Sequence, residues 1–187
     1  MSTTTRTPAA STPARATAGG TEITTTSPVV RYVGGALRLS LGWVFLWAFL
    51  DKLFGLGHET PSKGAWIHGG SPTQGFLAFA AKGPFKDIYH NIAGQAWADW
   101  LFMIGLLGIG AALILGVAMR LAAGTGALLL VLMWTAVLPP DNNLFMDDHL
   151  IYAMTLVLLA ALGAGRWLGL GEKWEQLPIV TKRPWLR

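Results

Sequence analysis

The residues best suited to chemistry are ionisable or hydroxyl side chains that interrupt or border long apolar runs. They are Arg38, Asp51, Lys52, Asp148, His149 and Tyr152. An ionisable group inside a membrane segment is costly, so each needs a structural or functional reason. Lys52, His149 and Tyr152 can donate hydrogen bonds or protons, and Asp51 and Asp148 can accept protons. In apolar surroundings this set fits a quinone, which needs an apolar channel, donors to its carbonyls and titratable groups.

We therefore predict a quinone site near the outer membrane face. The predicted catalytic residues are Asp51, Lys52, Asp148, His149 and Tyr152, and the predicted cofactor-binding residues are Arg38, Lys52, His149 and Tyr152. Structural alternatives stay open for three of them. Lys52 and Arg38 can extend to the headgroups on either side, and Asp148, like Asp147 before it, can cap a helix N-terminus and complement its dipole. Arg38 can also be an interior structural or gating charge, because it lies roughly 12 Å inside its helix at 1.5 Å per residue.

The elements that would hold these residues are four apolar segments. Only 13% of the 187 residues are charged, against about 25% in soluble domains. The segments cover about residues 29–56, 97–119, 121–138 and 149–170. A helix of roughly 20 residues spans the hydrocarbon core, and backbone groups in lipid must be satisfied within the segment. The sequence thus predicts an all-α protein, a four-helix transmembrane bundle. Small residues at Gly108, Ala112 and Gly116 predict close helix contacts.

The flanking residues predict the domain organisation and the orientation. Residues 1–28, rich in Thr, Ala, Ser and Pro, are predicted to be a disordered tail, residues 29–172 the membrane domain, and residues 173–187 a second tail. Lys and Arg gather in both tails and at Arg120, so both termini are predicted to be cytoplasmic. Within the long first outer loop, residues 73–81 and 86–92 predict short interfacial helices.

Several functional classes are disfavoured. The chain has no cysteine, which excludes disulfides, thiolate zinc sites and cysteine-bound Fe–S clusters within it. Its four histidines lack the spacing of a metal motif, and no pair faces across the helices, so neither metal nor haem is expected. The net charge of +4 flanks apolar runs, which indicates a lipid bilayer as partner and not nucleic acid.

Three short motifs, in order, resemble those of DoxX/DoxD-like membrane proteins. They are the first-helix residues Leu37, Arg38, Leu39, Gly42, Phe45, Leu46 and Lys52 to Gly55, the turn at residues 115–121, and the ending at residues 163–170. The loop at residues 66–72 is closer to the DoxD branch. The resemblance covers residues 31–172 and implies a four-helix membrane fold. It differs at Phe49, where the family often has glycine.

The resemblance also implies a function. DoxD-type proteins are subunits of thiosulfate:quinone oxidoreductase, and other members serve in membrane-associated oxidoreductase complexes. A DoxA-like or other redox partner would come from a separate chain, and a homo-oligomer is possible. The alternative is a non-catalytic membrane scaffold that holds soluble redox enzymes. A solute carrier is less favoured, since the sequence has no internal repeat or broken helix.

Overall fold

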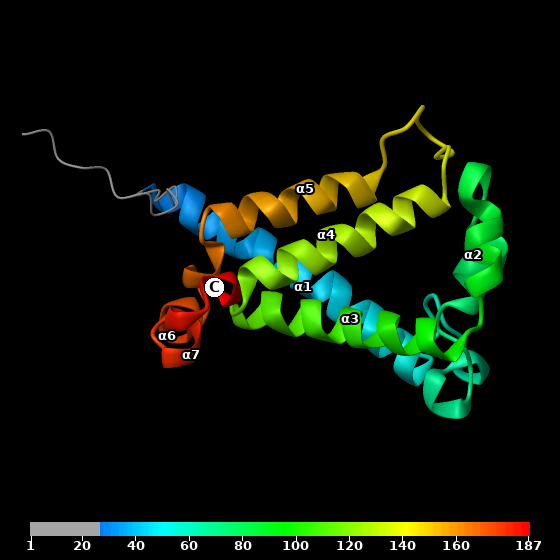
Figure 1. The fold of residues 1–187 in the computed structure, drawn as a ribbon, viewed down its shortest axis with the longest axis horizontal. Coiled ribbons are helices and arrows are strands. Elements are labelled where there is room, and N and C mark those ends of the chain that lie inside the picture. Colours follow the sequence, from blue (N-terminus) through cyan, green and yellow to red (C-terminus); the bar gives the residue numbers. More distant parts are fainter. Residues whose placement is uncertain (1–26) are drawn as a thin grey trace, which may run out of the picture.

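The computed structural model describes residues 27–187, which form helices joined by loops (Figure 1). The predicted tail at residues 1–28 therefore lies almost wholly outside the described residues. Four helices are long: α1 (Pro28–Phe54), α3 (Ala96–Leu115), α4 (Met119–Ala136) and α5 (Asp148–Ala161). Three are short: α2 (Lys86–Ile92), α6 (Gly171–Glu175) and α7 (Pro178–Lys182). The described residues contain no strand, which confirms the all-α prediction.

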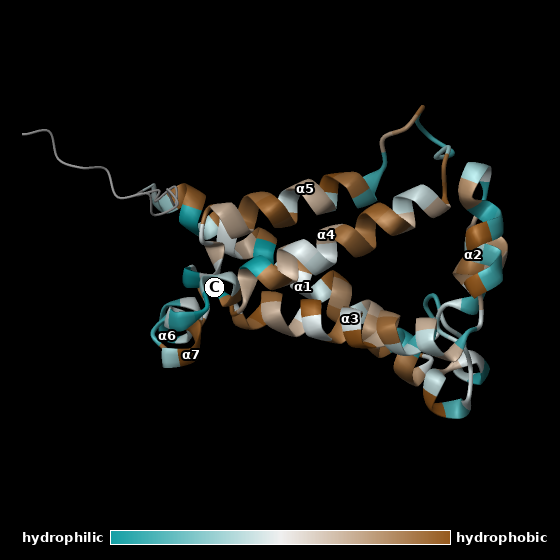
Figure 2. Ribbon diagram, in the orientation of Figure 1, coloured by the Kyte–Doolittle hydropathy of each residue, from teal (hydrophilic) through white to brown (hydrophobic). Residues whose placement is uncertain are grey.

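Three of these helices, α1, α3 and α4, are long and apolar enough to cross a membrane. Figure 2 shows hydrophobic residues along the long helices and hydrophilic residues gathered at the two ends of the molecule. These features support the prediction of a membrane protein. Helix α5 is apolar but has 14 residues, so its length is about 21 Å against about 30 Å of hydrocarbon.

The prediction of one continuous helix over residues 149–170 is wrong. Helix α5 ends at Ala161, and Gly163 takes a left-handed conformation with φ of 66°. Glycine adopts this conformation without steric cost, which ends the helix there. One 3₁₀ turn, Ala164–Arg166, follows, and the chain then runs past the first half of α1, where Trp167 is buried.

The long helices pack as two closely contacting pairs, α1 with α3 and α4 with α5, joined through the short α3–α4 turn. Glycines set the closest approaches. A Cβ on Gly110 of α3 would lie 2.8 Å from the backbone nitrogen of Leu46, and one on Gly42 of α1 would lie 3.0 Å from Ile114. The close contact predicted at Gly108 is wrong, because a Cβ there would meet no atom within 4 Å, whereas Gly116, at the end of α3, does allow a close approach, since a Cβ there would lie 2.5 Å from the Gly165 carbonyl oxygen.

The buried core draws on all four long helices. Its larger members are Leu41, Phe45, Met103, Leu106, Ile109, Leu113, Met119, Leu130, Leu156, Leu159 and Trp167. The helices lie close together at one end of the molecule and spread toward the other in Figure 1. The core therefore joins the two helix pairs, and the long helices set the positions of the loops and short helices at the two ends of the molecule.

The two ends differ in character. The basic end holds the start of α1, the α3–α4 turn with Arg120, and residues 171–187, and the loop end holds residues 55–95 and 137–147 (Figure 1). The predicted helix at residues 86–92 is confirmed as α2. In place of a regular helix over 73–81, a single π-helical turn covers Phe76–Ala80, after the Ser71 hydroxyl accepts a hydrogen bond from the Gln74 amide.

Candidate functional site

Arg38 lies on α1 and is completely buried. Its Nη1 donates to the carbonyls of Leu113 and, at 3.0 Å, Ile114. Its Nη2 donates to the carbonyls of Trp167 at 3.0 Å and Leu168 at 3.1 Å. We call these groups the Arg38 carbonyl cluster.

The four carbonyls lie where regular helical hydrogen bonding ends, although that of Leu113 also accepts a 3.3 Å hydrogen bond from the Gly116 amide. Leu113 and Ile114 end α3, and the last carbonyls of a helix have no partner within it. Trp167 and Leu168 lie in irregular chain. An unpaired buried carbonyl costs about 1–3 kcal/mol, and a planar guanidinium offers five donors in a fixed fork. This geometry favours the structural role for Arg38 over extension to headgroups or cofactor binding.

Glycines allow the backbone of two other segments to approach the Arg38 guanidinium closely. A Cβ on Gly116 would lie 3.2 Å from Arg38 Nη1, and one on Gly169 would lie 3.0 Å from Nη2. A Cβ on Gly165 would lie 2.4 Å from the Gly116 carbonyl oxygen. The α3–α4 turn and residues 163–171 therefore approach Arg38 and each other only because these positions lack side chains.

Asp51 has a comparable role at the loop end. The carboxylate is 1% exposed and accepts backbone hydrogen bonds from His58 at 3.3 Å, Glu59 at 3.0 Å and Thr60 at 2.8 Å. Both oxygens are used, so Asp51 fixes the start of the first loop against the end of α1. Hydrogen bonds to an ionised acceptor are stronger than neutral ones. The predicted catalytic role has no support from this geometry, which instead assigns Asp51 a structural task.

Asp99, which the sequence also places near the outer face but not among the predicted catalytic or cofactor-binding residues, performs the same task for α3. It is buried in the first turn of the helix. One oxygen accepts from the Ser71 hydroxyl at 2.8 Å, the Thr73 amide at 3.0 Å and the Thr73 hydroxyl at 2.6 Å. An aspartate opening an apolar helix is a visible signal, but its partners lie 26 and 28 residues earlier in the chain, where no local pattern identifies them.

The start of α5 carries an acid–base pair. Asp147 caps the helix through a 3.3 Å hydrogen bond from the Leu150 amide, and its other oxygen lies 2.8 Å from His149 Nδ1. Of the two acids expected to favour this helix N-terminus, Asp147 is the cap, while Asp148 lies in the first turn, 68% exposed, with Oδ1 3.5 Å from the same nitrogen. One turn later Tyr152 is partly buried against the core. With its proton on Nδ1 facing Asp147, His149 presents Nε2 as the available basic atom.

The predicted site residues fall into two groups. Lys52 is partly exposed in the last turn of α1, where a cation complements the helix dipole. The end of α1 and the start of α5 lie at the same end of the molecule but toward opposite edges of it (Figure 1). Within residues 27–187, no hydrogen bond or ion pair joins Asp51 or Lys52 to His149 or Tyr152. The one location that keeps the predicted chemistry together is the start of α5.

Of the residues that carry the resemblance to DoxX/DoxD-like proteins, those in the first half of α1, in the α3–α4 turn and in residues 163–170 meet around Arg38, whereas Lys52 to Gly55 lie at the loop end. Gly42 follows one turn later on α1, and Gly116 and Gly165 approach each other beside the guanidinium. No family model matches this chain, and no curated protein or solved structure matches it either. The DoxX/DoxD-like relationship therefore stays a prediction. In this fold, the motif residues around Arg38 have a structural role: they bury its guanidinium among four backbone carbonyls.

Proposed function

We propose that the chain crosses the membrane four times with both termini in the cytoplasm. Three helices meet the length requirement, and the start of α1 lies at the same end as the carboxyl terminus. An even number of crossings is needed to bring them to one side, which requires α5 to cross. The basic end carries Arg31, Arg120, Lys173, Lys182 and Arg183, whereas the loop end carries Lys63, Lys82 and Lys86 in its long loop and no Lys or Arg in residues 137–147, so the positive-inside rule favours the cytoplasm for the basic end.

The Arg38 carbonyl cluster explains how a 14-residue helix can complete this crossing. Non-helical backbone is tolerated at membrane depth only where it is buried in protein. Residues 164, 165 and 167 are buried, and Arg38 satisfies the carbonyls of Trp167 and Leu168. Residues 162–170 thus extend α5 toward the basic end without exposing unpaired backbone to lipid.

For the activity, we propose a DoxX/DoxD-like membrane subunit of a quinone-linked oxidoreductase. The observation that carries it is the Asp147–His149 pair with Tyr152 one turn further along the same face of α5. The Tyr152 hydroxyl would donate to one quinone carbonyl, His149 in its protonated form would donate to the other from Nε2, and Asp147 would stabilise the charge of the imidazolium. Reduction consumes two electrons and two protons per quinone. The electrons would come from a partner chain that oxidises thiosulfate or another sulfur donor.

Direct binding tests this proposal without needing the partner. The purified full chain is titrated with a soluble quinone analogue, and the dissociation constant is compared among variants. His149→Ala and Tyr152→Phe are expected to weaken binding about tenfold each, the cost of roughly one hydrogen bond in an apolar site. His68→Ala, an exposed histidine at the same end, is the matched control. Equal affinity of wild type and all variants for the analogue would show that the start of α5 is not a quinone site.

The second candidate is the non-catalytic scaffold. It is favoured by Arg38 and Asp51, whose polar atoms hold the chain's own backbone and order both ends. A scaffold would bind no quinone and would purify with a soluble redox enzyme in fixed stoichiometry. The quinone-linked subunit would bind the analogue whether or not that enzyme is present, so one titration separates the two.

A further inference from the structure

Residues 171–187 are folded against the rest of the protein, although a simple tail was expected there. The Arg120 amide donates to the carbonyl of Arg187 at 2.7 Å, and Trp174 Nε1 donates to the carbonyl of Leu186 at 2.6 Å. Val180 is completely buried. We call residues 171–187 the carboxyl-terminal cap. Its backbone is fixed to the α3–α4 turn, so its surface side chains have defined positions.

The cap exposes apolar and basic side chains next to each other. Ile179 and Trp185 are each 55% exposed, and Leu177 is 42% exposed. Lys182 and Arg183, both exposed, line a shallow depression of about 290 Å³ together with Pro178 and Ile179. Apolar side chains beside cations are what interfacial membrane segments present to lipid.

The charge on the cap is not neutralised internally. Glu175 is held by Arg166 at 2.7 Å, which leaves exposed Glu172 as the other acid of the cap. Lys173, Lys182 and Arg183 form no ion pair within residues 27–187. The cap surface therefore carries net positive charge and is complementary to an anion.

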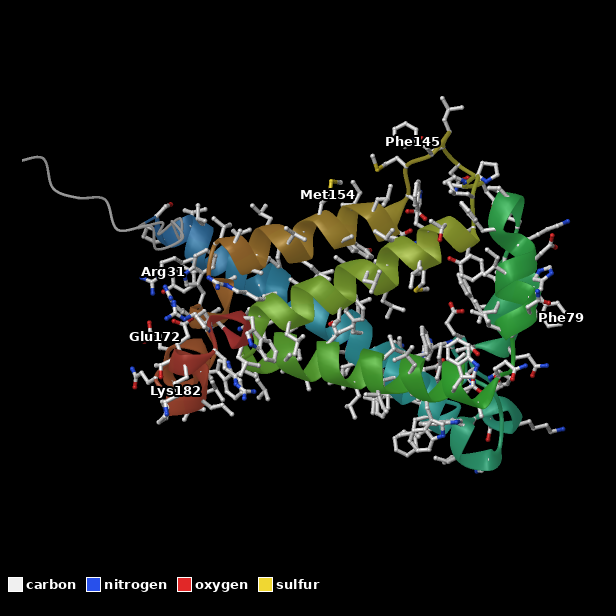
Figure 3. The ribbon with its side chains drawn as sticks, viewed as in Figure 1. Arg31, Phe79, Phe145, Met154, Glu172 and Lys182 are labelled. Atoms are coloured by element: carbon white, nitrogen blue, oxygen red, sulfur yellow. The ribbon has the colours of Figure 1, made fainter. Side chains whose placement is uncertain are left out.

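The cap also lies at the level where headgroups would be found. Figure 3 places Lys182 and Glu172 at the same end of the molecule as Arg31, near the start of α1. Tyr32, next along α1, is 66% exposed, and exposed Tyr and Trp residues concentrate at membrane–water interfaces. Tyr32 and Trp185 are thus suited to the same boundary.

We propose that the carboxyl-terminal cap binds anionic phospholipid, with Lys182 and Arg183 on the headgroup phosphate and Ile179 and Trp185 inserted beside the acyl chains. The inference rests on the proposed four-pass topology, because it requires the cap to face the cytoplasmic leaflet. Anionic headgroups attract basic residues near the surface of that leaflet. The cap then fixes the depth of the short α5 crossing, since it follows directly from the chain that Arg38 holds.

The test measures lipid retention on the full-length protein. Protein purified in mild detergent is mixed with phosphatidylglycerol or phosphatidylcholine, and bound lipid is counted by native mass spectrometry. Wild type is expected to retain phosphatidylglycerol preferentially. The double variant Lys182→Ala/Arg183→Ala is expected to lose about 30-fold in affinity for it, about fivefold for each charge removed. Lys63→Ala/Lys86→Ala removes two exposed cations at the loop end and is the matched control.

Three outcomes would overturn the proposal. Equal retention of the two lipids means that charge does not select, and equal loss in the two double variants means that the cap is not the site. Competition by millimolar inorganic phosphate would identify a free-anion site. Extraction of the membranes with alkaline carbonate separates failure of the proposed topology from failure of the lipid site. Release of the protein would refute the membrane-spanning topology. A protein that stays in the membrane but shows no lipid preference would refute only lipid binding by the cap.

Discussion

At the scale of single residues, Arg38 joins parts of the chain that are far apart in sequence, because it donates to four carbonyls from two distant segments. Arg38→Met keeps the approximate volume and removes all four hydrogen bonds. We expect the free energy of unfolding in detergent to fall by about 3 kcal/mol or more, since breaking a buried charged network strands its partners. Chemical denaturation followed by circular dichroism measures it.

Arg31→Met supplies the comparison for Arg38. It changes the same residue type on the same helix, two turns earlier and exposed, so we expect a change within about 0.5 kcal/mol. Similar losses in both variants would mean that the carbonyl cluster contributes little. Intermediate stability in Arg38→Lys would support the cluster, because one ammonium cannot reach all four carbonyls in the planar arrangement of a guanidinium.

The sequence identified the important residues more successfully than their roles. The position of Arg38 in the apolar segment showed that it lies too far inside the helix to be a simple flanking charge. A charge at that depth needs a partner inside the protein. The partner carbonyls lie 75 and 129 residues further along the chain, and the backbone carries no residue-specific signal for accepting a hydrogen bond. The structural contacts of Asp51 were hidden for the same reason: three loop amides that donate to a carboxylate leave no trace in composition or periodicity.

At the scale of elements, apolar length and helix-ending signals located α1, α2, α3 and α4 to within a few residues, because lipid leaves helix as the only economical backbone form. The fourth segment was overextended. Its apolar composition continues through Leu170, but the left-handed Gly163 ends the regular helix well before that residue. Hydropathy measures solubility in lipid and carries no information on left-handed backbone conformation. This explains why the fourth helix was predicted to be too long.

The pairing of α1 with α3 supplies an element-scale prediction. Gly110→Ala would place a methyl group 2.8 Å from the backbone of Leu46. Helix backbones cannot yield as a flexible side chain does, so we expect a loss of about 1–3 kcal/mol from forced separation of the helices. Thermal denaturation of the purified protein in detergent, monitored by tryptophan fluorescence, measures it.

Gly108→Ala is the control for that helix pair. Gly108 lies on the same helix two residues away, and a Cβ there meets no atom within 4 Å. Alanine is a better helix former than glycine by up to about 1 kcal/mol, so this variant should be neutral or more stable. If Gly108→Ala were the more damaging of the two, α1 would not be the neighbour that limits α3, and an unseen contact on the Gly108 face would be required.

At the scale of the whole molecule, the decisive question is whether α5 crosses the membrane, because the sidedness of the cap and of the proposed quinone site both follow from it. The absence of native cysteine makes single-cysteine variants free of background labelling. Asn142→Cys lies in the exposed loop between α4 and α5, and Lys173→Cys lies in α6. With four crossings, a membrane-impermeant maleimide should label position 142 on intact cells and position 173 only after permeabilisation. Identical behaviour at both positions would show that α5 lies along one face, and the structural role proposed for Arg38 in completing a short crossing would then fail.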